Sequence, residues 1–120
     1  MDWPRTLRGP MMAIEKNSAL RMLGLATRAG KTVTGAQGCG KAVVRGKARL
    51  VLIASDAAED TGERMTRLCA RENIPCRIAG NGDQLGQFTG KDCRMVVGII
   101  DPVFANRIRD LLDKANDTKE

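Results

Sequence analysis

A glycine-rich segment that ends in a lysine is the part of this sequence best suited to chemistry. Residues 35–41 read Gly-Ala-Gln-Gly-Cys-Gly-Lys, and Ala42 follows. The spacing matches a phosphate-binding P-loop up to its last position, where that motif has Ser or Thr. Glycines let backbone N–H groups approach an anion closely, and a lysine adds positive charge. The segment therefore predicts an anion site, either for the phosphates of a nucleotide or for a nucleic-acid backbone.

Three features argue against a nucleotide. Ala42 has no hydroxyl to bind Mg²⁺, which a P-loop requires. The segment ahead of the loop, residues 31–34, is short and polar, whereas a P-loop follows a buried strand. A carboxylate for the metal would have to come from Asp56, which lies only fifteen residues after Lys41. A P-loop-like nucleotide-binding protein therefore stays as an alternative hypothesis.

A helix start that suits a phosphodiester backbone is the better interpretation of the same residues. Gly38 and Gly40 fall near the first turn of an expected helix, where each glycine costs about 1 kcal/mol relative to alanine. Two such losses of stability in one helix start suggest that another group approaches the helix backbone closely. Lys31 precedes the helix and Lys41 lies one turn into it, and the free N–H groups and positive dipole end attract anions. In the alternative interpretation the glycines only mark a turn and Lys41 is simply solvated.

The distribution of charge also favours a polyanion. Residues 1–49 hold ten Lys or Arg against two acids, whereas residues 50–120 hold ten against twelve. The net charge of +6 therefore arises around the glycine-rich segment, which favours RNA, DNA or an acidic surface as the partner. Two Phe, one Trp and no Tyr are too few for a base-stacking platform. The alternative is that this charge serves solubility alone.

No catalytic or metal-binding constellation is visible. The chain has no His, and its four cysteines, Cys39, Cys69, Cys76 and Cys93, never form Cys-x-x-Cys, so the usual zinc patterns are excluded. Cys93 has no neighbouring base that would make it a nucleophile. Cys69 and Cys76 lie in apolar surroundings typical of core residues. We therefore expect no cofactor, no enzymatic activity, reduced thiols and a cytoplasmic location.

Helix and strand patterns alternate along the chain with little spacer. Continuous apolar runs at residues 49–54 and 94–100 predict strands buried on both faces, and shorter strands are expected at residues 31–34 and 75–79. Helices are expected over residues 17–29, 36–45 and 61–73, after Asn81 or Asp83, and from Pro102 onward. This order predicts a three-layer α/β/α sandwich with about four strands.

The 120 residues are the length of one domain. We expect this domain over residues 12–114, between a flexible arm at 1–11 and a polar tail at 115–120, with Met11 or Met12 as a candidate translation start. Asp56 and Asp60 are expected to cap the helix at residues 61–73. No segment has the apolar length of a signal peptide or a membrane span, so no membrane partner is expected.

Four blocks of sequence carry a resemblance to a known family. In order, they are LGLATRAGKTVTG (residues 23–35), KAVVRGKARLVLIASDA (41–57), NIPC (73–76) with LGQFTGKDCRMVVGI (85–99), and DPVFANRI (101–108). With these blocks the chain resembles the L7Ae/L30e ribosomal protein family, which binds kink-turn RNA, and in particular its bacterial YlxQ-type branch. The resemblance implies an α/β/α sandwich with a mixed four-stranded sheet, which agrees with the order of the elements.

The resemblance also implies an RNA-binding site in two parts. The first part is the loop and helix start after the first strand, here Gly35, Ala36, Gln37, Gly38 and Lys41, with Lys31 ahead of it. The second part is the loop before the last strand, here Gly90, Lys91, Asp92, Cys93 and Arg94. Lys91 and Arg94 have an alternative role as charges that keep a strand from aggregating.

One departure from the family concerns specificity. Kink-turn binders commonly carry Asn-Glu where this chain has Gln37-Gly38. Gln37 keeps an amide for base edges, but Gly38 has no carboxylate to contact guanine.

We therefore expect a non-enzymatic, monomeric RNA-binding protein that recognises structured, ribosomal-type RNA, with the ribosome as a further candidate partner. Besides nucleotide binding, the remaining alternative is a module that docks on a protein through the apolar surface of its last helix.

Overall fold

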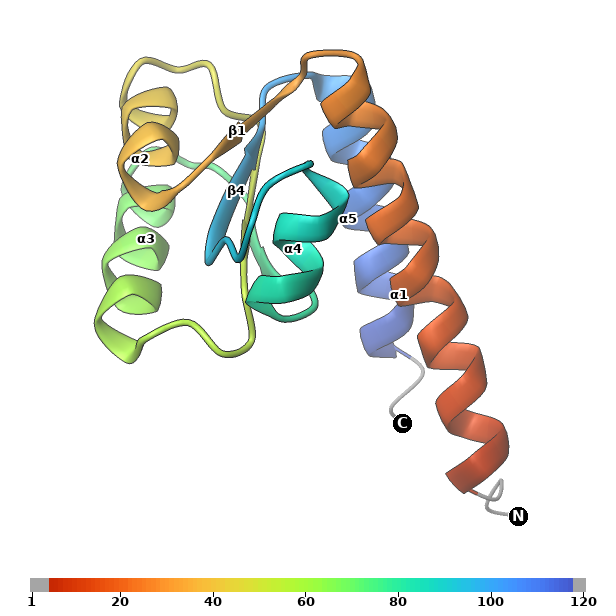
Figure 1. The fold of residues 1–120 in the computed structure, drawn as a ribbon. Helices are drawn as coiled ribbons and strands as arrows, with labels where there is room; N and C mark the ends of the chain where they lie inside the picture. Colours follow the sequence, from red (N-terminus) through yellow and green to blue (C-terminus); the bar gives the residue numbers. More distant parts are fainter. Residues whose placement is uncertain (1–4, 118–120) are drawn as a thin grey trace.

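The computed structural model describes the backbone of residues 5–117 and the side chains of residues 17–115. In this part of the chain, helices and strands alternate and form three layers with the sheet in the middle (Figure 1). The helices are α1 (Arg5–Arg28), α2 (Ala36–Val44), α3 (Glu59–Arg71), α4 (Gly82–Phe88) and α5 (Pro102–Asp117). The strands are β1 (Thr32–Thr34), β2 (Leu50–Ile53), β3 (Cys76–Ile78) and β4 (Val96–Ile99). The α/β/α architecture predicted from the sequence is confirmed.

The sheet is mixed, as the family resemblance implied. Its strand order is β1-β4-β2-β3, with β4 antiparallel to both of its neighbours and β3 parallel to β2. The central strands β2 and β4 are the two continuous apolar runs of the sequence, and every residue in them is buried. In the register, Val97 of β4 lies between Thr34 of β1 and Leu52 of β2.

Alternate side chains of β2 pack into two separate cores. Leu50 and Leu52 contact the layer formed by α1, α4 and α5, whereas Val51 and Ile53 contact the layer formed by α2 and α3. Figure 1 shows these two groups of helices on opposite faces of the sheet. Each fully buried Leu, Ile or Val stabilises the fold by about 1.5–3 kcal/mol. Since both faces are covered, the edges of the sheet and the outer helix surfaces are left for function.

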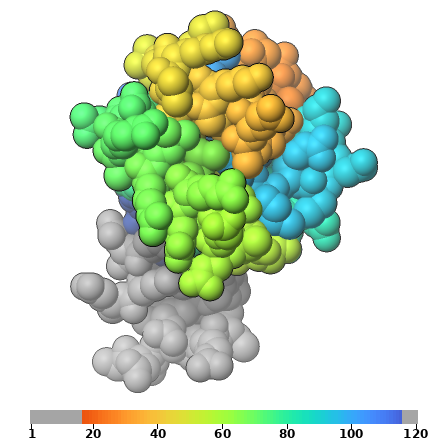
Figure 2. Space-filling model, turned by 90° about the vertical axis from the view of Figure 1, so that its left-hand side faces the viewer, coloured from red at the N-terminus to blue at the C-terminus, as the bar shows by residue number. Residues whose placement is uncertain are grey.

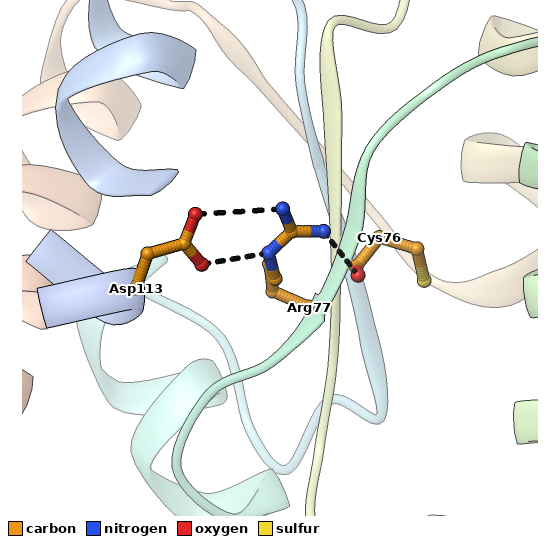
Figure 3. A network of polar contacts seen from close by, with 3 residues as sticks. All are labelled: Cys76, Arg77 and Asp113. Carbon is orange, nitrogen blue, oxygen red and sulfur yellow. Dashed lines mark hydrogen bonds and ion pairs between the residues drawn. The ribbon is translucent and has the colours of Figure 1, made fainter. Parts of the chain in front are cut away.

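An ion pair ties the edge strand β3 to α5 (Figure 3). Arg77 Nε and Nη2 donate to the two carboxylate oxygens of Asp113, at 2.8 and 3.4 Å, and Nη1 donates to the Cys76 carbonyl at 3.0 Å. The hydrogen bond to Asp113 raises the pKa of Arg77. Both side chains are partly exposed, so the pair stabilises the fold by about 1 kcal/mol or less.

The two ends of the chain differ from prediction. Helix α1 begins at Arg5, twelve residues ahead of the predicted start, so it overlaps the segment expected to be a flexible arm. At the other end α5 continues to Asp117, and Ala115 of the predicted tail is buried. The physical reason is that Ala115 continues the apolar stripe of Ile108 and Leu112. Residues 1–4 and 118–120 lie outside the described part.

The prediction that Asp56 and Asp60 cap α3 is wrong. The N-cap of α3 is Ala58, which has no side-chain cap bond, and Asp60 lies inside the first turn, 2.8 Å from Arg64. Asp56 Oδ1 instead accepts from the backbone N–H of Gly82, the first residue of α4, at 2.8 Å. This occurs because the carboxyl ends of the parallel strands β2 and β3 meet, which places the segment after β2 against the start of α4.

Candidate nucleic-acid interface

Both predicted parts of the site lie at one edge of the sheet, by which we mean the side where strands begin or end and not an outer strand. Strand β1 ends and β4 begins at this edge, because the two strands are antiparallel neighbours. The Gly35 N–H, just after β1, donates to the Val96 carbonyl at 2.8 Å, which joins the start of α2 to the strand that follows the loop 90–94. Figure 2 shows the start of α2 (orange to gold) beside the loop before β4 (cyan).

The start of α2 is open. Gly35 is its N-cap, with φ 88° and ψ 150°, a backbone region that is essentially restricted to glycine. No side-chain cap bond is formed and the first turn holds no acid, within the part of the chain that the structure describes. The first helical bond runs from Cys39 N–H to the Gly35 carbonyl. The N–H groups of residues 36–38 therefore remain for a ligand at the positive end of the helix.

The glycines inside α2 have internal explanations. A Cβ on Gly38 would lie 3.0 Å from Val33 Cγ1, so the glycine allows α2 to pack closely on β1. A Cβ on Gly40 would lie 3.7 Å from Leu68 Cδ2, which is ordinary contact. Between them, Cys39 is buried, and desolvation raises the pKa of its thiol to about 12. Close approach of an outside partner is therefore not needed to explain Gly38.

The loop 90–94 is held against α4 by a second pair of glycines, which sequence reasoning missed. Gly82 and Gly86 lie one turn apart on the same face of α4. A Cβ on Gly86 would overlap the Asp92 carbonyl oxygen, and one on Gly82 would come within 2.6 Å of Cys93 Sγ. The available signal was the four-residue spacing of two glycines within a short helix.

Backbone hydrogen bonds fix the same loop. The Lys91 N–H donates to the Gly86 carbonyl at 2.8 Å, and the Arg94 N–H donates to the Gly82 carbonyl at 2.9 Å. The side chains of Lys91, Asp92 and Cys93 are exposed, and Arg94 is half-buried. The loop thus presents polar side chains from a backbone position that α4 determines.

The start of α4, in contrast to that of α2, is closed. Asn81 and Gln84 form a capping box, in which each side chain accepts from the other's backbone N–H at 2.8 and 2.9 Å. Of the two predicted caps, Asn81 and Asp83, the structure confirms Asn81. Asp56 satisfies the N–H of Gly82 in addition, so its carboxylate is engaged within the fold and not placed as the metal-binding acid of a P-loop.

Cys93 has no features of a catalytic nucleophile. Desolvation, followed by the negative charges of Asp83 and Asp56, raises the pKa of its thiol, so the sulfur is protonated near neutral pH. The two carboxylates also show that this part of the edge carries negative as well as positive charge. Carboxylates accept hydrogen bonds from the amino groups of bases, so a mixed edge suits base contacts as well as phosphates.

Lys31 lies apart from the other predicted residues. Its carbonyl accepts from Ile100 N–H at the far end of β4, and it precedes β1, whereas Gly35 follows that strand. A strand of this length spans about 10 Å. The structure therefore brings ten of the eleven predicted residues to one edge or onto α2 beside it, and places Lys31 at the opposite edge.

Other kinds of site find little support in the described residues. They contain no group of three or more His, Cys, Asp or Glu that would hold a metal ion, and their helices are not long and apolar enough to cross a membrane. The apolar stripe of α5 that would have formed a docking surface, Ala105, Ile108 and Leu112, is buried in the core.

At one edge of the α/β/α sandwich, an open helix start therefore lies beside a pinned loop, and backbone donors and polar side chains are exposed there together. The profile of the ribosomal protein L7Ae/L30e/S12e/Gadd45 family matches residues 17–109. The chain belongs to this family. The match begins after the first half of α1.

Individual relatives agree with this assignment. The chain is similar to two proteins named RNA-binding protein YlxQ. It is 37% identical to that of Bacillus subtilis over 77% of this chain and 92% of the relative, and 32% identical to that of Enterococcus faecium over 82% and 94%. A structure of a protein with unknown function from Bacillus halodurans C has a TM-score of 0.77 and 37% identity, covering 79% of this chain and 96% of that one. The Giardia lamblia 15.5kD RNA binding protein has the same fold, with a TM-score of 0.70, 24% identity and 90% coverage of each chain.

Proposed function

We propose that this protein binds structured RNA, without catalysing a reaction, through the start of α2 and the loop 90–94. The observation that carries the proposal is the open helix start, whose backbone donors lie at the same sheet edge as the loop. Membership of a ribosomal protein family and two relatives named as RNA-binding proteins support RNA as the polyanion.

Each part of the interface has a distinct role in this proposal. The backbone N–H groups of residues 36–38 donate to phosphate oxygens, and the exposed ammonium groups of Lys41 and Lys91 add charge. The amide of Gln37 and the carboxylate of Asp92 are both exposed and contact base edges, because an amide donates and accepts while a carboxylate accepts from amino groups. Phosphate contacts position the RNA and base contacts select it.

Kink-turn RNA is the first candidate for the selected RNA. Gly38 lacks the carboxylate that the family's kink-turn binders commonly have at this position. Asp92 is an exposed acid at the same edge, and in this proposal its carboxylate takes over the contacts with base amino groups. We further propose that the RNA is ribosomal, and that the protein acts as a monomer in the cytoplasm.

Filter binding at several salt concentrations tests the proposal. The probes are a kink-turn RNA, the same RNA with the kink abolished by substitution, and a plain duplex. Lys41→Gln with Lys91→Gln is expected to weaken binding of all three by about tenfold and to reduce the salt slope by about 1.5–2. Arg107→Gln with Lys114→Gln removes the same charge from exposed positions of α5 and is the matched control.

The outcomes separate the hypotheses. Equal losses in both double variants would show that net charge, not the proposed edge, attracts RNA. Absence of RNA binding by the wild type, together with Mg²⁺-dependent ATP or GTP binding that Lys41→Gln abolishes, would replace RNA by a nucleotide. A preference for the kinked probe would establish kink-turn recognition.

A further inference from the structure

The opposite edge of the sheet carries a second concentration of positive charge. Helices α1 and α2 end there and strands β1 and β2 begin there. Five exposed cations belong to these ends, and we refer to them as the basic edge: Arg28, Lys31, Arg45, Lys47 and Arg49.

Two similar turns build the basic edge. Gly30, with φ 73°, lies two residues beyond the end of α1, and Gly46, with φ 74°, lies two residues beyond the end of α2. In each turn the lysine after the glycine donates its backbone N–H back into the helix, Lys31 to the Ala26 carbonyl at 2.8 Å and Lys47 to the Ala42 carbonyl at 2.9 Å. These bonds are those of a glycine-terminated helix. The same device therefore places a lysine immediately beyond each helix.

The sheet then fixes the spacing of the basic edge. The Ile100 N–H donates to the Lys31 carbonyl at 2.9 Å, and the Arg49 N–H donates to the Ile99 carbonyl at 2.7 Å. Lys31 and Arg49 thus lie on either side of the end of β4. Two strand spacings separate them, which is about 10 Å.

These cations have no ion-pair partner among the described residues, whereas the arginines of α3 and β3 do. Arg64, Arg67, Arg71 and Arg77 each lie within 4 Å of a carboxylate. The acids near the basic edge are already engaged. Asp101 Oδ2 accepts from the Phe104 N–H at 3.0 Å, and Glu72 pairs with Arg71 at 3.3 Å. The charge of the basic edge is therefore uncompensated within the described fold.

Interaction with helix dipoles accounts for only part of this cluster. A cation at the C-terminal end of a helix is stabilising. Arg28 lies in the last turn of α1 and Arg45 is the C-cap of α2. Lys31, Lys47 and Arg49 lie beyond the helix ends, where the dipole effect has fallen off. Three neighbouring unpaired cations repel one another, which favours an external anion as their partner.

A polar stripe on α2 connects this edge to the proposed RNA site. Gln37, Lys41 and Arg45 are spaced four residues apart, so they lie on one face of the helix, and all three are exposed. The nine residues of α2 extend over about 14 Å. Figure 2 shows the whole of this path on one side of the molecule, from the start of α2 (orange to gold) to the segment before β2 (yellow).

We infer that the bound RNA continues from the start of α2 along the helix to the basic edge, where Lys31, Lys47 and Arg49 hold a second stretch of its phosphate backbone. The inference rests on the proposed function, since it extends the path of the same RNA. Lys31, which lies apart from the first site, thereby contacts the RNA at the second site. This second contact depends on charge and on the spacing of the RNA phosphates, and not on base sequence.

The test compares two triple variants with equal loss of charge. Lys31→Gln/Lys47→Gln/Arg49→Gln removes the basic edge, and Arg21→Gln/Arg107→Gln/Lys114→Gln removes three exposed cations from α1 and α5. The probes are a kink-turn RNA with a short helical arm and the same RNA with that arm longer by about one helical turn. Circular dichroism and thermal unfolding verify that both variants fold.

The expected result is specific for the long-armed probe. The wild type binds this RNA with a salt slope steeper by about 2–3 than the short-armed one, and the basic-edge variant loses this difference together with about tenfold in affinity. The control variant keeps both. Equal slopes for the two probes in the wild type, or equal losses in the two variants, would overturn the inference. If Lys41→Gln/Lys91→Gln abolishes binding while the basic-edge variant binds normally, the proposed function stands without the extended path. If neither the wild type nor any variant binds either probe, the proposed function itself fails.

Discussion

Helices α2 and α4 both begin at the same edge of the sheet, yet one start is open and the other is closed. At α4 the side chains of Asp56 and Asn81 accept from the backbone N–H groups of Gly82 and Gln84. At α2 the cap is Gly35, which has no side chain to offer. Since an uncapped helix start leaves donors for a ligand, the contrast supports our proposal that α2, and not α4, faces the RNA.

The glycines of the two helices differ in the same way. The loop before β4 occupies the space next to the glycines of α4, because a Cβ on Gly86 would overlap the Asp92 backbone. Those of α2 meet only side chains, Val33 at 3.0 Å and Leu68 at 3.7 Å. The glycines of α4 are therefore explained by a close approach of the chain's own loop to the helix. In α2 we propose that the ligand contacts the helix start itself.

Replacement of Gly86 by alanine should have the largest effect. The new methyl group overlaps backbone atoms of Asp92, so the loop 90–94 must move away from α4. We expect a loss of about 3 kcal/mol or more in the free energy of unfolding, since overpacking against backbone has few ways to relax. Chemical denaturation measures the loss, and RNA binding measures the displacement of Lys91.

Gly62→Ala is the matched control for this change. Gly62 lies inside α3, and nothing lies within 4 Å of a Cβ placed there. The substitution should stabilise the protein by about 0.5–1 kcal/mol through helix propensity alone. If Gly86→Ala behaved like Gly62→Ala, the loop would not be pinned as described.

Gly35→Ala should have the next largest effect. At φ 88° and ψ 150° a residue with a Cβ is strained by about 1–3 kcal/mol, although nothing lies within 4 Å of the added methyl group. Thermal unfolding should show this loss, and the resulting shift of the α2 start should weaken RNA binding as well. Wild-type stability would show that the chain turns into α2 by another backbone path.

Asn81→Ala opens the start of α4 and should cost about 1 kcal/mol, which is typical for the loss of an N-cap. Asn81→Asp keeps an acceptor for the Gln84 N–H and serves as the control. Because Asp56 still holds the Gly82 N–H, we expect no gain of RNA affinity from the opened helix. An increase in affinity would mean that any open helix start at this edge binds RNA.

The sequence predicted the layers and nearly every element because the signals were local, whereas the mixed sheet was implied by the family resemblance. The apolar runs at β2 and β4 were long enough to define the centre of the sheet. Gly30 marked the end of α1, and Asn81 marked the start of α4. These features depend on residues that are close together in the chain.

The errors arose where contacts between distant segments decide the structure. Asp56 was assigned to the nearer helix, but the parallel pairing of β2 with β3 places it at the start of α4, 26 residues further along. Lys31 is only four residues from Gly35 in sequence, yet β1 runs between them from one edge of the sheet to the other. The role of Gly86 depends on the path of residue 92, which no local pattern specifies.

The smallest change in stability, and the sharpest test of the open helix start, should come from Ala36→Asp. Ala36 is exposed in the first turn of α2, which has no acid. A carboxylate there interacts favourably with the helix dipole and should stabilise the protein by about 0.5 kcal/mol. The same charge repels phosphate, so RNA affinity should fall by about tenfold while the fold becomes more stable. Ala36→Asn has nearly the same shape without the charge and should bind RNA like the wild type. Equal RNA affinity of the Asp and Asn variants, measured by titration at low salt, would mean that the start of α2 does not face the RNA backbone.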